Sequence, residues 1–112
     1  MIEAIVLDHL REQLEAPAYA ERPKELPASY CLIEKTGTSQ SNFISTTVFA
    51  VQSYAETLEQ AAELSDQVKE AMASLVAYQD VTKVKLESEY NDTNAATGQY
   101  RYQAVFSIVH YE

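Results

Sequence analysis

The sequence predicts an α+β fold of two layers, in which a four-stranded, mostly antiparallel sheet carries two helices on one face. Two segments, residues 2–15 and 57–78, repeat apolar residues at helical spacing. A pair of β-prone stretches follows each of them, which gives the order α-β-β-α-β-β. No linker or change of composition divides the 112 residues, so we expect residues 1–112 to form a single α+β domain.

The first helix is expected from residue 2 to about 15. Its apolar positions are Ile2, Ile5, Val6, Leu10 and Leu14, with Leu7 at the edge of the stripe. Pro17 ends this segment, because proline cannot continue a helix. The three prolines between Pro17 and Pro27 predict an extended connector. A short edge strand near Tyr19 would make the sheet five-stranded.

A hairpin should follow this connector. Ser29–Thr36 is apolar and β-prone, and Phe43–Tyr54 has a strand pattern. Between them, the sequence GTSQSN from Gly37 to Asn42 is rich in turn-forming residues. We therefore expect two strands joined by a polar loop of six residues.

The second helix is marked by Thr57, with Gln60 three positions later, as in a capping box. Its apolar side is wide, and consists of Leu58, Ala61, Ala62, Leu64, Val68, Ala71, Met72, Leu75 and Val76. Acidic residues at spacings of three and four share the opposite side, and they are Glu56, Glu59, Glu63, Asp66 and Glu70. Each pair of like-charged neighbours costs roughly 0.2–0.5 kcal/mol. Packing of the apolar side must therefore stabilise this helix.

The second hairpin combines a strand at Val81–Tyr90, a polar loop at Asn91–Gly98 and a strand at Gln99–Tyr111. The first of these strands alternates. Its core side should carry Val84, Leu86 and Tyr90, and its solvent side Lys83, Lys85, Glu87 and Glu89.

The net charge of −9 argues against binding to nucleic-acid phosphates or to an anionic membrane surface, and no sequence-specific nucleic-acid binding is expected. The acidic helix side would then either face solvent or line a passage through which DNA slides without sticking. The N-terminal residues lack the basic and apolar regions of a signal peptide, and no apolar stretch is long enough to span a membrane.

The sequence contains no catalytic, cofactor-binding or metal-binding pattern, so we expect neither an enzyme nor a cofactor. His9 and His110 have no ligand-spaced partners, and Cys31 lies in an apolar run typical of a buried structural thiol. The glycines form no phosphate-binding or nucleophile motif.

Two strands carry apolar residues on both sides of the pleat. Examples are Val48 to Val51 and Val105 to Val109, whereas helices of this number can cover only one face. The second face is then covered by another chain, unless the sheet curls over its own helices. Tyrosines are frequent at such interfaces, and the strand segments contain Tyr30, Tyr54, Tyr90, Tyr100, Tyr102 and Tyr111.

Three segments together carry a resemblance over almost the whole chain. They are SYCLIEKTGTSQSN, FAVQSYAETLEQAAELSDQVKEAM and VKLESEYNDTNAATGQYRYQAVFSIVHYE. In pattern they resemble the small tail-completion proteins of long-tailed bacteriophages and prophages, also called tail terminators or tail-to-head joining proteins.

The resemblance implies a homo-oligomeric ring, commonly of six copies, on the last ring of the major tail-tube protein. The ring would stop tube growth and contact a head-completion or connector protein, first in the host cytoplasm and then in the virion. The family offers no fixed contact motif. Our own candidate interface residues, mostly from the two polar loops and the strand tyrosines, are Gly37, Ser39, Asn42, Tyr54, Asn91, Asn94, Tyr100 and Tyr102.

Two other functions fit the same sequence features. One is a head-completion or neck connector protein of the same small α/β build. The other is a monomeric protein-binding module that captures a peptide on a sheet edge.

Overall fold

The computed structural model describes residues 1–93 and 99–111. Its elements are α1 (Ile2–Gln13), β1 (Ala18–Tyr19), β2 (Tyr30–Ser41), β3 (Ile44–Ala55), α2 (Leu58–Ala73), a 3-10 turn η1 (Ser74–Ala77), β4 (Val81–Asn91) and β5 (Tyr100–Tyr111). The predicted α+β class is confirmed. The short edge strand near Tyr19 exists, so the sheet has five strands in the order β1-β2-β3-β5-β4.

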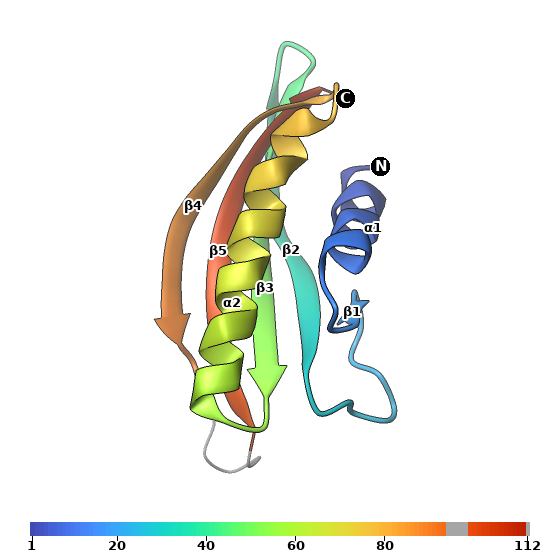
Figure 1. Ribbon diagram of the computed structural model, residues 1–112. Helices are drawn as coiled ribbons and strands as arrows, with labels where there is room; N and C mark the ends of the chain where they lie inside the picture. Colours follow the sequence, from blue (N-terminus) through green and yellow to red (C-terminus); the bar gives the residue numbers. More distant parts are fainter. Residues whose placement is uncertain (94–98, 112) are drawn as a thin grey trace.

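The sheet is antiparallel except at its first edge, where β1 runs parallel to β2. Both helices lie on the same face, with α2 along β3 and β5 and α1 beside β2 (Figure 1). The prediction that the helices cover one face only is therefore confirmed.

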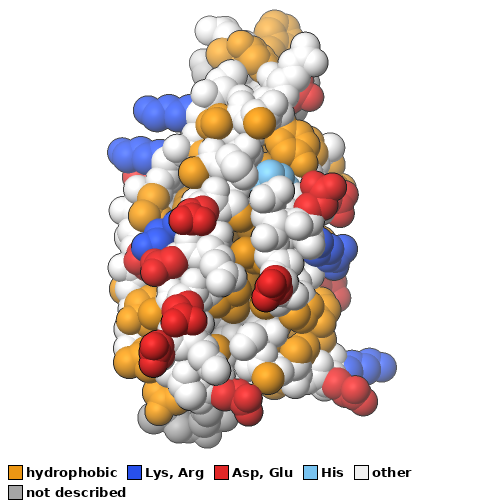
Figure 2. Space-filling model, viewed as in Figure 1, with side chains coloured by type: hydrophobic (Ala, Val, Ile, Leu, Met, Phe, Trp, Pro, Cys, Tyr) orange, Lys and Arg blue, Asp and Glu red, His pale blue; other side chains and the backbone are white. Residues whose placement is uncertain are grey.

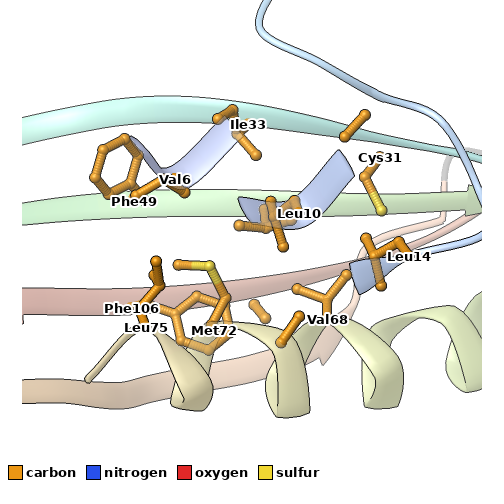
Figure 3. Packing of buried hydrophobic residues seen from close by; sticks show 14 of the residues in the cluster. Val6, Leu10, Leu14, Cys31, Ile33, Phe49, Val68, Met72, Leu75 and Phe106 are labelled. Carbon is orange, nitrogen blue, oxygen red and sulfur yellow. The ribbon is translucent and has the colours of Figure 1, made fainter. Parts of the chain in front are cut away.

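The core lies between this face and the helices (Figure 3). Val6 and Leu10 of α1 and Val68 and Met72 of α2 are fully buried there, against strand side chains such as Phe106. Burying side chains of this size stabilises a fold by roughly 1.5–3 kcal/mol each. This packing explains why α2 is helical despite its acidic outer side.

His9 joins the two helices. Its Nε2 atom lies 2.8 Å from the carbonyl oxygen of Ala71 and 2.6 Å from the Ser74 hydroxyl, and its ring packs edge-on against Tyr78. Only a protonated Nε2 can donate to the carbonyl, which assigns the tautomer. His9 is thus a structural residue at the point where α2 gives way to η1.

The prediction of a six-residue loop at Gly37–Asn42 was wrong. β2 continues to Ser41, and Ser41 pairs directly with Ile44, so the connection is a two-residue turn formed by Asn42 and Phe43. Both turn residues have positive φ, 52° and 68°, as in a type I′ turn. The polar residues of GTSQSN occupy the ladder because β3 offers backbone partners along its whole length. Gly37 and Ser39 are strand residues.

The predicted alternation in β4 was partly wrong. The register shifts between Leu86 and Ser88, so Glu87 is an inserted residue and the side chains after it change face. Glu89 pairs with the buried Ala104 and reaches α2, whereas Tyr90 pairs with Gln103 on the opposite face. Leu86 is 43% exposed, because β4 is an edge strand that α2 covers only in part.

Thr57 caps α2 as expected, since its hydroxyl oxygen accepts a hydrogen bond from the Gln60 amide at 3.1 Å. The helix ends at Ala73 and continues as η1 rather than as α-helix to Tyr78. Two residues assigned to its apolar side are exposed, namely Leu58 at the first position of α2 and Val76 in η1.

Candidate functional site

Neither helix covers the second face of the sheet, the helix-free face (Figure 1). Side chains alternate along strands, so the residues that point away from the helices follow from the register. They include Leu32, Val48, Ala50, Val105 and Val109, of which all but Ala50 are partly exposed. The face therefore has an apolar half toward the β2–β3 turn, formed by Val48, Ala50, Val105 and Val109, whereas Leu32 lies beside Gln52 in the other half.

The other half of this face is held by hydrogen bonds between side chains. Gln52 donates to Gln103 at 2.9 Å, and Gln103 donates to the Tyr90 hydroxyl at 2.5 Å. Arg101 donates to the Tyr54 hydroxyl at 3.0 Å and forms an ion pair with Asp92 at 2.6 Å. The Tyr54 hydroxyl and the ion pair raise the pKa of Arg101, which keeps it charged. These contacts give this half a fixed pattern of donors and acceptors.

Tyr54 itself is not available as a free interface side chain. Its ring stacks on that of Tyr30 with centroids 4.5 Å apart and planes 6° from parallel, and it is 7% exposed. Tyr19 packs edge-on against the ring of Tyr30. Burial raises the pKa of the Tyr30 hydroxyl, which has no hydrogen-bond partner among the described residues. The three tyrosines form a structural cluster at one end of the sheet.

The other candidate interface residues do not form one site. Gly37 and Ser39 lie exposed on β2, Asn42 lies in the turn, and Asn91, Tyr100 and Tyr102 lie at the opposite end of the molecule. Asn91 accepts hydrogen bonds from the amide and hydroxyl of Thr93, which shape the end of β4. Asn94 and most of the predicted loop fall outside the described residues.

The β2–β3 turn is an exposed apolar site that was not predicted from the sequence. Phe43 is 82% exposed there, and its neighbours Ile44 and Tyr111, which pair across β3 and β5, are 41% and 50% exposed. Figure 2 shows hydrophobic side chains at this end of the molecule. The sequence did contain a signal for this turn, because Asn42–Phe43 lies between two polar segments that can form strands. A phenylalanine at the second position of a type I′ turn is unusual, so the signal was weak.

The predicted acidic side of α2 is exposed in the protomer. Glu56 precedes the helix, and Glu59, Glu63, Asp66 and Glu70 are all exposed along it (Figure 2). Lys69 is the only cation on this helix, and it forms ion pairs of 2.9 Å with both Asp66 and Glu89. The Glu89 contact raises the pKa of Lys69. Most of the acidic surface is therefore left uncompensated.

An apolar groove lies between α1 and β2, with a volume of about 390 Å³. Ala4, Leu7, Ile33 and Phe49 supply most of its wall. Glu3 and Lys35 stand at the same groove and neutralise each other in an ion pair of 2.9 Å, which lowers the pKa of Glu3. Glu34 also lines the groove, which thus offers an apolar wall beside one ion pair and one further carboxylate.

Among residues 1–93 and 99–111, no group of three potential metal ligands comes together. Burial raises the pKa of the Cys31 thiol to about 12, which suits a structural thiol rather than a nucleophile. No helix in the described ranges is long and apolar enough to cross a membrane. The Nε2 atom of His110 forms a hydrogen bond of 2.8 Å with the Thr47 hydroxyl.

Comparison with models of known protein families finds no match, and comparison with curated proteins finds none either.

Proposed function

We propose that this protein is a structural assembly protein, a tail terminator that caps a bacteriophage tail tube as a ring of its own copies and joins the tail to the head. The observation that supports the proposal most is the apolar half of the helix-free sheet face. An exposed apolar surface of this kind is typical of contact with another chain. The resemblance described above supplies the kind of assembly. The proposal includes no enzymatic step.

The mechanism of such a cap would be geometric. A subunit that matches the tube on one side and a different protein on the other ends polymerisation, because the next tube subunit finds no complementary surface. The hydrogen-bonded half of the sheet, with Gln52, Gln103 and Tyr90 in fixed positions, is suited to such selective contact. The exposed acidic side of α2 would face the DNA passage or the surrounding solvent.

Self-assembly of tail-tube protein in vitro tests this proposal. Added protein should limit tube length in proportion to its concentration, and electron microscopy of the tube ends should show a ring with several copies of the chain. Native mass spectrometry at micromolar concentration should detect the same ring on the tube. Tubes of unchanged length, together with a chain that stays monomeric in the presence of tube protein, would refute the proposal and favour a peptide-binding module.

The neck connector protein is the second candidate, because the same sheet face and acidic helix suit a ring one layer higher. Phage particles that lack the protein distinguish the two. Absence of a terminator should give overlong tails that fail to join heads, whereas absence of a connector should give heads that leak DNA.

A further inference from the structure

The β2–β3 hairpin carries no charged residue after Lys35. Residues 36–55 contain no Asp, Glu, Lys or Arg, although charged residues make up 22% of the chain and its net charge is −9. Copies of so acidic a chain repel each other at most surfaces. The tip of this hairpin can approach another copy without that repulsion.

The tip is also strained and apolar. Phe43 has a φ of 68°, a conformation that costs a residue with a Cβ roughly 1–2 kcal/mol, and glycine would adopt it freely. Its ring is 82% exposed, so packing within the protomer does not offset this cost. Strain and exposure of a bulky residue at one position indicate a role in contact with another molecule.

The groove between α1 and β2 is suited to receive this side chain. Its volume of about 390 Å³ exceeds the roughly 150 Å³ of a cavity known to bind a benzene ring, so it can hold the Phe43 ring and part of a neighbouring residue. Its wall is mostly apolar, and of the three charged residues at it Glu3 and Lys35 neutralise each other, which leaves Glu34 at the rim. An uncharged tip and such a groove match each other chemically.

We infer that Phe43 of one copy inserts into the α1–β2 groove of a second copy, an inference that rests on the proposed self-assembly. Tip and groove are different surfaces of the same chain, so the contact is heterologous and each copy can both give and receive a ring. Repeated around an axis, such a contact closes into a ring rather than stopping at a dimer.

Crosslinking between copies tests the inference with Phe43 left in place. Ser41 lies beside the tip and Ala4 at the groove, and both are exposed, so Ser41→Cys and Ala4→Cys should fold normally. A short bismaleimide should join the S41C/A4C double variant into a ladder of oligomers on a denaturing gel. Either single variant should stay uncrosslinked, and a mixture of the two should give only dimers. The buried Cys31 should not react.

Phe43→Gly provides the second measurement, because glycine keeps the turn and removes the ring. We expect this change to weaken self-association by roughly tenfold or more and to abolish the ladder when combined with S41C/A4C. Ala4→Arg, which places a long charged side chain at the groove, should do the same. Ala73→Arg, at the exposed C-terminal end of α2, is the matched control and should not.

The outcomes separate this inference from the proposed function. A wild-type chain that is monomeric both alone and with tail-tube protein overturns both. A wild-type ring that persists in F43G overturns the inference only, as do crosslinked dimers of S41C alone, which would mean that two tips meet each other. Loss of tube binding in F43G with an intact ring would assign the tip to the tube protein and also overturn it.

Discussion

Replacement of Phe43 by glycine should make the isolated protomer more stable. The left-handed conformation costs a phenylalanine roughly 1–2 kcal/mol, and glycine avoids this cost. Glycine loses roughly 0.5–1 kcal/mol more backbone freedom on folding, which offsets part of the gain. The ring is 82% exposed, so its removal sacrifices little burial. The net expectation is a gain of about 0.5–1 kcal/mol.

Urea unfolding followed by circular dichroism measures this gain, at protein concentrations where the midpoint no longer depends on concentration. A chain of 112 residues should also show a rise in Tm of roughly 2–4 °C. Phe43→Ala is the matched control, because alanine removes the ring but keeps the strain, and its stability should stay within about 0.5 kcal/mol of the wild type. If F43G were no more stable than F43A, the argument from backbone strain would be refuted.

Three further substitutions or reactions test the packing described above. Glu89→Ala should lower the free energy of unfolding by about 1 kcal/mol, because Ser65 and Lys69 of α2 lose their shared hydrogen-bond partner. Glu87→Ala, on the helix-free side of the same strand, is the control and should lower it by less in the same urea titration. Thr57→Ala should lower the free energy of unfolding by about 1 kcal/mol through loss of the α2 cap, and Thr57→Ser should restore it. Burial raises the pKa of the Cys31 thiol to about 12, so this thiol should resist an aromatic disulfide reagent at about pH 8 in the folded protein and react at once in urea. Rapid reaction of the native protein would contradict the burial of Cys31.

Periodicity alone was enough to predict most of the architecture. The helical spacing of Val6 and Leu10 and the capping residue Thr57 are local signals, and the structure uses them as expected, although α1 ends at Gln13, one residue before Leu14. The covering of only one sheet face followed from counting helices against apolar strand positions. These features could be read because each depends on residues close together in the chain.

The errors have a common cause, which is pairing between distant segments. The polar run Gly37–Asn42 was interpreted as a loop, but the β3 backbone opposite it extends β2 to Ser41. The inserted residue Glu87 reverses the faces of Glu89 and Tyr90, and no alternation pattern reveals such an insertion. Phe43 was missed for the same reason, since a two-residue turn is defined by where two strands stop pairing.

The extra residue in β4 has a consequence for how this protein could change over generations. Loss of the single codon for Glu87 would remove this bulge, and Ser88, Glu89 and Tyr90 would keep their partners on β5 and therefore their faces. Loss of any residue from the regularly paired part of the strand would instead move every later side chain to the opposite face. The bulge is thus the position in β4 where a one-residue deletion should disturb the sheet least.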